Sequence, residues 1–183
     1  MVAKLSTLDG SEWIANRYER VWWRQATAGP TRVVAAVSEQ RIDVILQLAA
    51  HLSGPFLLLW VLHTPRGGSQ PGRYQSTPLT GAELSDLLRK YAALFEEDGR
   101  SDLWVHSKEP LATIVLDHHD LMYAYGPLDS FVAELSALGF VEGTAAIPSP
   151  HAHEYRAEVD DLERALAIEC DWDVTALRPE DTQ

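Results

Sequence analysis

The sequence lacks two features that would tie the chain to a membrane or to a disulfide-bonded scaffold. It has one cysteine, Cys170, so no disulfide can form within the chain, as is typical of proteins in the reducing cytosol. Its longest uninterrupted apolar run, 56–62, has seven residues, whereas a membrane-spanning helix needs roughly 20. The first residues carry charges and lack the apolar stretch of a secretory signal. We therefore expect a cytoplasmic protein that does not span a membrane.

Basic residues are also scarce. Lysine and arginine number 15 against 27 acidic residues, and the net charge is −12 at pH 7. Because binding to nucleic-acid phosphates requires a basic surface, this balance argues against a nucleic-acid binder. The acidity is uneven, with a net charge of +3 over 1–73 and −15 over 74–183. A strongly acidic second part favours fast association with a basic protein partner.

The motifs of the commoner enzyme classes are absent. The sequence contains no G-x-S-x-G, G-x-x-x-x-G-K-[ST], G-x-G-x-x-G, H-E-x-x-H or C-x-x-C pattern. Arginine outnumbers lysine 12 to 3, which favours a GC-rich bacterial genome. Small size, acidity and the missing signatures together predict a non-enzymatic bacterial protein that acts through protein contact, as an immunity-like or regulatory partner, without a cofactor.

Composition and periodicity indicate one α+β domain over 1–183, with a mostly antiparallel central sheet and about five helices. Apolar residues make up 46% of the chain and charged residues 23%, which is typical of a globular protein with a sizeable core. Apolar spacing predicts helices over about 11–26, 39–52, 80–97, 127–138 and 159–170, and strands over about 32–37, 56–63, 102–107, 112–117, 121–125 and 153–155. The segment 31–52 fits either a strand followed by a helix or one longer helix.

The segment 102–125 reads as a three-stranded meander with two unlike faces. Side chains alternate across a strand, so Trp104 and His106 point away from their aliphatic neighbours in the first strand, as do Tyr123 and Tyr125 in the third. This aromatic set forms either a core layer under a helix or the floor of a ligand or partner site. The second reading makes the protein a small-ligand sensor.

Two segments are expected to be mobile. The segment 64–80 is rich in glycine and proline and reads as a flexible surface loop that could serve as a lid. Arg66 and Arg73 in this segment, with the glycines beside them, are candidates to bind an anionic ligand. The acidic tail after Arg178 is expected to fray.

The predicted first helix carries a candidate interface. Trp23 lies on the side opposite Ile14 in a helical projection, and exposed tryptophan is enriched at protein interfaces. A basic row on the same helix, Arg17, Arg20 and Arg24, is expected to pair with acids from the second part of the chain.

One titratable cluster points to a metal. Asp117 and His119 lie two residues apart in the predicted hairpin loop, and His151 and His153 would share one face of a strand. Carboxylate and imidazole groups are ligands for divalent transition metals. If the strand lies beside the hairpin, these four side chains complete a ligand set. The alternative function is therefore a metal-dependent hydrolase with a metal-bound water as nucleophile.

Overall fold

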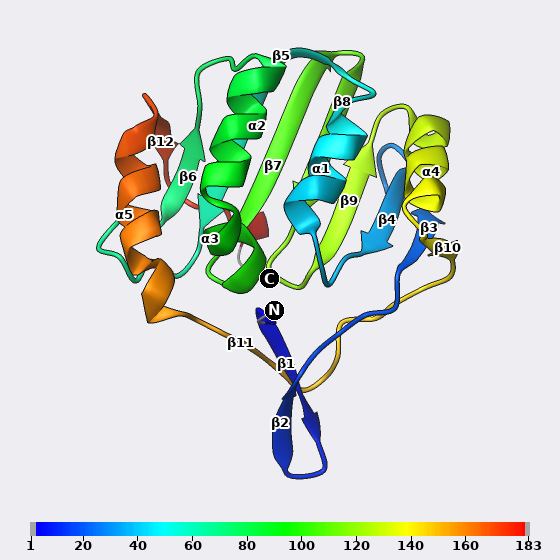
Figure 1. Cartoon of the computed structure of the whole chain (residues 1–183), viewed down its shortest axis with the longest axis vertical. Coiled ribbons are helices and arrows are strands. Elements are labelled where there is room, and N and C mark those ends of the chain that lie inside the picture. The colour runs from blue at the N-terminus through cyan, green and yellow to red at the C-terminus, as the bar shows by residue number, and fades with distance from the viewer. Residues whose placement is uncertain (1–2, 182–183) are drawn as a thin grey trace.

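Helices cover one face of a nine-stranded sheet in the computed structural model, which describes residues 3–181 (Figure 1). Neighbouring strands are antiparallel except for the parallel pair at one edge, β10 and β3. Across the sheet the strands are β10 (Val141–Glu142), β3 (Val21–Gln25), β4 (Arg32–Ala36), β9 (Leu121–Tyr125), β8 (Leu111–Leu116), β7 (Ser101–Glu109), β5 (Ser53–Leu62), β6 (Gly72–Gln75) and β12 (Asp173–Thr175). The fold is therefore α+β with a mostly antiparallel sheet, as the sequence predicts.

A smaller sheet projects from one end of the large one, as the dark blue hairpin in Figure 1 shows. Its strands are β11 (His151–His153), β1 (Leu5–Asp9) and β2 (Glu12–Ala15), with β1 in the centre. The helices are α1 (Arg41–Ala49), α2 (Gly81–Lys90), α3 (Ala92–Glu97), α4 (Leu128–Ala137) and α5 (Asp160–Glu169), with 3-10 turns η1 (Ala157–Val159) and η2 (Pro179–Asp181). Within residues 3–181, no helix is long and apolar enough to cross a bilayer.

The main core lies between the helices and the near face of the large sheet. Leu103 and Val105 of β7 are buried there, together with Met122 and Ala124 of β9. Leu48 of α1 is among the helix residues that pack in the same cluster. Trp104, His106, Tyr123 and Tyr125 are half-buried and follow the opposite alternation. The predicted division of the meander into an aliphatic and an aromatic face is confirmed.

Most of the predicted elements are present. The registers of β7, β8 and β9 form the predicted meander, and the segment 31–52 is a strand followed by a helix, β4 and α1. The predicted helix over 80–97 begins at the Thr80–Glu83 capping box but is divided at Tyr91 into α2 and α3. Helices α4 and α5 match the predicted helices, whereas Tyr155 lies outside the short strand β11.

The predicted helix over 11–26 is wrong. This segment forms strands β2 and β3, joined by an extended stretch. Its apolar residues fit a helical stripe, but they are mostly aromatic or β-branched and suit strands equally well. Antiparallel pairing of β3 with β4 and of β2 with β1 favours strands over a helix. Both partner strands lie outside 11–26, so the spacing within that segment does not reveal them. The basic row is consequently dispersed, and of its members Arg24 pairs with an acid of the second part, Asp129.

The segment 64–80 contains a strand that the sequence analysis missed. Tyr74 of β6 is buried with its ring centroid 4.9 Å from that of Trp60. Strand β6 pairs with the preceding strand β5 on one side and with β12, about a hundred residues further along the chain, on the other. Beyond Arg178, residues 179–181 form η2, and Asp181 is buried against Arg73. The remainder of the predicted frayed tail, 182–183, lies outside the described residues.

Candidate metal site and adjoining pocket

Five of the seven histidines converge at one end of the large sheet. The rings of His63, His118, His119, His151 and His153 form a continuous cluster in which neighbouring centroids are 4.2–5.3 Å apart. They come from the residue after β5, from the turn between β8 and β9, and from β11. The structure thus brings together three of the four residues that the sequence predicted as metal ligands, and it adds two more histidines.

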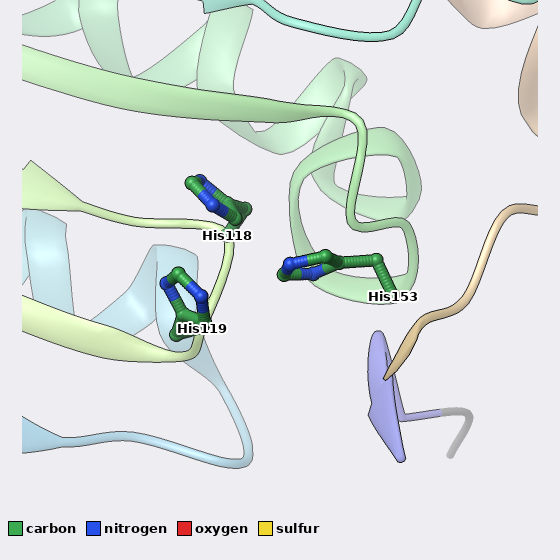
Figure 2. Close-up of side chains that lie close together, drawn as sticks. All are labelled: His118, His119 and His153. Atoms are coloured by element: carbon green, nitrogen blue, oxygen red, sulfur yellow. The ribbon is translucent and has the colours of Figure 1, made fainter. Parts of the chain in front are cut away.

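Three of these imidazoles face one another closely enough to share a metal ion. One ring nitrogen from each of His118, His119 and His153 lies within 4.8 Å of the other two (Figure 2). His118 and His119 are adjacent in the turn after β8, and His153 reaches them from the smaller sheet. Three histidine nitrogens with an open fourth position are a ligand set of catalytic zinc sites.

Buried charges hold the turn that carries His118 and His119. Asp120 has a left-handed backbone, with φ of 66°. Its carboxylate accepts hydrogen bonds from Nε and Nη2 of Arg41, each at 2.6 Å. The Lys4 ammonium donates to the Asp117 carbonyl oxygen at 2.9 Å and lies 3.4 Å from Asp120. Burial lowers the pKa of Lys4, although the Asp120 charge opposes that shift. The ion pairs therefore fix the backbone from which the two histidines project.

Asp117 has a different place from the one that the sequence suggested. Its Oδ1 accepts hydrogen bonds from the backbone amides of His119 and Leu121, at 2.9 and 2.8 Å. Its Oδ2 is 3.4 Å from Nδ1 of His119. The carboxylate therefore lies behind the His119 ring and orients it, and Asp117 is not one of the three converging ligands.

Asp102 of β7 performs the same role for His118. Its Oδ1 lies 2.6 Å from Nδ1 of His118 and accepts the His118 backbone amide, and its Oδ2 is 3.1 Å from Nε2 of His63. Burial alone would raise the pKa of Asp102, but the hydrogen bond with His118 and the nearby His63 imidazole hold it well below its usual range. Because a carboxylate only accepts, Nδ1 of His118 carries the proton and Nε2 keeps its lone pair. Carboxylates placed in this way behind histidines orient metal ligands.

His153 is held neutral and has an unsatisfied ring nitrogen. Burial and the neighbouring imidazoles lower its pKa to about 4, so the ring is uncharged at neutral pH. Its Nδ1 is buried and has no hydrogen-bond partner among residues 3–181. Leaving a buried polar atom unpaired destabilises a fold, and such an atom calls for a partner. Because the ring is neutral, one of its two nitrogens keeps a lone pair that a metal ion shared with His118 and His119 could use.

His151 lies beside the triad and keeps one ring nitrogen available. Its Nδ1 is 2.8 Å from the Pro148 carbonyl oxygen, so Nδ1 carries the proton and Nε2 keeps a lone pair. The His63, Asp102 and His118 side chains form a second group of converging ligand atoms. Both oxygens of Asp102 already face the rings of His118 and His63, which makes this group better suited to supporting the triad than to holding an ion of its own.

A pocket of about 540 Å³ adjoins the histidines on the face of the sheet opposite the helices. Its volume is in the range of sites for small molecules. Trp104, Tyr123 and Tyr125 line it, as the sequence suggested for a ligand site, whereas His106 lies outside the lining and bonds to Thr113. Burial, followed by the Asp117 charge, raises the pKa of Tyr123, so its hydroxyl stays protonated. The remaining lining residues are Arg32, Asp102, Thr113, Val115, Asp117, His118, His119, Ile147, His151, Glu180 and Asp181.

The other predicted ligand or partner residues lie outside this lining. Arg73 pairs with Asp181 at 2.5 Å and lies over the Trp104 ring, so it supports the pocket wall. Trp23 is half-buried in the smaller apolar cluster. The guanidinium of Arg66 lies 5.6 Å from the Tyr155 ring, and its backbone amide donates to an internal acid, Glu163.

Sequence reasoning missed four residues that the structure places at the site, and one of them, His118, is adjacent in sequence to the predicted ligand His119. His63 follows an apolar strand and Arg32 begins one, and neither has a local pattern that indicates a site. Asp102 had a usable signal, because it is an acid on the same alternating face as Trp104 and His106. An acid on a half-buried strand face requires a partner.

No family model, curated protein or solved structure matches this chain.

Proposed function

We propose that the protein is a metal-dependent hydrolase whose transition-metal ion is held by His118, His119 and His153. One observation carries the proposal: three imidazole nitrogens from two distant segments lie within 4.8 Å of one another. The carboxylates of Asp102 and Asp117 support it, because they face the far nitrogens of His118 and His119.

The ligand chemistry favours zinc or a similar borderline metal. Imidazole suits Zn²⁺, Cu²⁺, Fe²⁺ and Ni²⁺, whereas Mg²⁺ and Ca²⁺ prefer oxygen ligands. Three protein ligands leave a coordination position for water, and zinc lowers the pKa of such a water to about 7. The metal thus supplies a nucleophile at neutral pH.

The residues around the triad supply positioning and proton transfer. His151 lies next to His119, with ring centroids 5.1 Å apart, and its Nε2 is able to accept the proton that the attacking water releases. The water oxygen forms a bond to a carbonyl or phosphoryl centre, the bond to the leaving group breaks, and His151 returns the proton to that group. The pocket lined by Trp104 and Tyr123 holds the substrate.

Zn²⁺ titration of the metal-free protein by calorimetry tests the metal site. We expect one ion per chain in the wild type, and tetrahedral absorption bands with Co²⁺ as the probe. His118→Ala and His153→Ala should each weaken binding by more than the ~100-fold that loss of a supporting partner causes. His51→Ala is the matched control, because His51 is remote from the cluster and pairs with Glu134. Equal affinity in the triad variants and the wild type would refute the site.

Hydrolysis is measured separately with the zinc-loaded protein. 4-Nitrophenyl acetate and bis(4-nitrophenyl) phosphate report attack at a carbonyl and at a phosphoryl centre. We expect zinc-dependent release of nitrophenolate from one of them, and loss of that release in His151→Ala with metal binding retained. Stoichiometric zinc without turnover of either ester would contradict the hydrolase assignment and leave a metal-binding protein.

A second candidate function is contact with a basic protein partner. Ile168 of α5 is 85% exposed and Val174 of β12 is 50% exposed. Both lie in 154–183, where ten acids stand against three bases. Apolar side chains set among charges of one sign favour steered association with an oppositely charged protein. Affinity purification from the source cells should recover a basic protein in a yield that falls as salt rises. A yield that ignores ionic strength would count against this function.

A further inference from the structure

Arg32 presents an uncompensated positive charge to the pocket. Its Nε donates to Gln25 Oε1 and its Nη1 to the Tyr125 hydroxyl, both at 2.7 Å. Its guanidinium carbon lies 4.1 Å from the centroid of the Tyr123 ring. These contacts hold the group in place. Across residues 3–181, Arg32 forms no ion pair with a carboxylate and its Nη2 donates to no acceptor.

The acids of the pocket wall have partners of their own. Asp102 contacts His118, and Asp117 accepts two backbone amides. Asp181 pairs with Arg73, and the Glu180 carboxylate lies 3.8 Å from the Arg178 guanidinium. None of them neutralises Arg32, although the chain carries an excess of twelve negative charges. An arginine that is fixed by neutral groups and left without an acid is suited to receive an anion from outside, since its planar fork matches carboxylate and phosphate oxygens.

Strand geometry places Arg32 at the end of the pocket away from the histidines. Strand β4 pairs with β9 so that Val33 lies opposite Ala124 and Ala36 lies opposite Leu121. Arg32 is therefore beside Tyr125, while the turn with His118 and His119 precedes Leu121. Four residues of extended strand separate these two ends, a distance of roughly 13 Å.

The wall between the two ends is aromatic and apolar. Trp104, Val115 and Tyr123 lie opposite one another in adjacent strands and form a row across the sheet. All three line the pocket. A ligand that reaches from Arg32 to the histidines must lie over this row, where flat or apolar groups pack well.

We infer that the pocket takes an organic anion with a flat, apolar body about 10 Å long, with its carboxylate or phosphate on Arg32 and its reactive bond at the histidines. Calling this ligand the substrate depends on the proposed hydrolase function, whereas its binding to Arg32 and the aromatic row does not. The preference for an anion over a neutral compound of the same shape is the distinctive consequence.

Calorimetric titration with three naphthalene probes tests the inference. The probes are 2-naphthoate, 2-naphthyl phosphate and the neutral 2-naphthamide, each used with and without Zn²⁺. We expect at least one anion to bind about tenfold more tightly than the amide, and the tighter of the two identifies the anionic group as carboxylate or phosphate. Equal binding of the amide and both anions, or no binding of any probe, would overturn the inference.

Arg32→Gln isolates the role of the charge. It should reduce the affinity for the preferred anion about tenfold and leave the affinity for the amide unchanged, with Arg32→Lys between the two. Arg24→Gln is the control, because Arg24 is exposed on the neighbouring strand and pairs with Asp129. Thermal unfolding establishes that each variant is folded. Undiminished anion binding by folded Arg32→Gln would refute the assignment.

The experiments distinguish failure of the metal-site proposal from failure of the anion-site inference. Zinc binding by Arg32→Gln should equal that of the wild type, because Arg32 lies at the far end of the pocket. If the triad bound no metal and the anion preference depended on Arg32, the ligand site would stand and the hydrolase function would fall. If zinc bound but no anion preference appeared, the metal site would stand and the inferred anion site would fall.

Discussion

The orientation of the His118 and His119 rings at the candidate metal site depends on partners that lie on the side of each ring away from the ion. Asp102 lies 2.6 Å from Nδ1 of His118, so that nitrogen carries the proton, and Asp117 lies behind the His119 ring. Nε2 of His118 is left free as a ligand. The same logic applies to His151, whose Nδ1 faces the carbonyl oxygen of Pro148. Chemistry at the site therefore depends on residues that contact no substrate.

Asp102→Asn provides a test at this scale. An amide is able to donate to Nδ1 of His118, which would move the proton to the nitrogen that faces the triad. We expect zinc affinity to fall 10–100-fold, the usual effect of removing a supporting partner of a metal ligand. Competition with a chromophoric chelator measures the change. Asp129→Asn, which alters an exposed acid that pairs with Arg24, is the control. Unchanged zinc affinity in Asp102→Asn would show that Asp102 does not orient the ligand.

Local hydrogen bonds determine where helix α2 begins. Helix α2 begins at Thr80, whose side chain accepts the Glu83 amide while the Glu83 carboxylate accepts the Thr80 amide at 2.7 Å. This reciprocal pair satisfies two amides that the first turn leaves without partners. The helix ends near Tyr91, which is fully buried and separates it from α3.

Thr80→Ala should lower the free energy of unfolding by about 1 kcal/mol, because it removes the acceptor for the first turn of α2. Urea denaturation monitored by circular dichroism measures the change. Glu83→Gln is the matched variant, since glutamine also completes a capping box and should destabilise less. A Thr80→Ala midpoint equal to that of the wild type would mean that the cap contributes nothing to stability.

At the scale of the whole molecule, one buried ion cluster joins the C-terminal part to the large sheet. Arg100, just before β7, contacts the carboxylates of Asp98, Asp160 and Glu163 at 2.6–2.8 Å. Glu163 also accepts the backbone amides of Arg66 and Ser69. The glycine-rich loop thus surrounds an anion, as its sequence suggested, but in the structure that anion is a side chain of α5.

This cluster predicts a dependence of stability on pH. Burial alone would raise the pKa of Glu163, but hydrogen bonds from the 66–69 amides and from Arg100 lower it overall from its ordinary value of 4.5. The unfolded chain therefore takes up this proton first as the pH falls. The stability from Glu163 is present above about pH 4.5 and is lost as the pH drops through the folded-state pKa.

Glu163→Gln should be about 1–3 kcal/mol less stable than the wild type at neutral pH, because a buried charged hydrogen bond is weakened. The difference should shrink below about pH 4.5, where the wild type loses the same contribution. Urea denaturation over a pH series measures both curves. A difference that stayed constant with pH would exclude Glu163 as a source of the acid sensitivity.

Local sequence patterns determined the features that arise within one segment. The alternation in 102–125 set the two faces of the meander, with Trp104 and Tyr123 on the side that became the pocket, and the Thr80–Glu83 pair set the start of α2. These features follow from side-chain period and from hydrogen bonds over one turn, so neighbouring residues suffice to specify them. The charge of −12 and its uneven distribution are likewise properties of the sequence.

Tertiary structure alone decided which distant residues meet. His153 lies 34 positions beyond His119, and only the pairing of β11 with β1 brings its ring to the turn that carries His118 and His119. The strands over 12–25 and the short strand β6 likewise depend on partners from other segments. Strand pairing and burial join groups that share no local pattern. The sequence therefore named candidate ligands, and the fold placed two of them, His119 and His153, beside His118 in the triad.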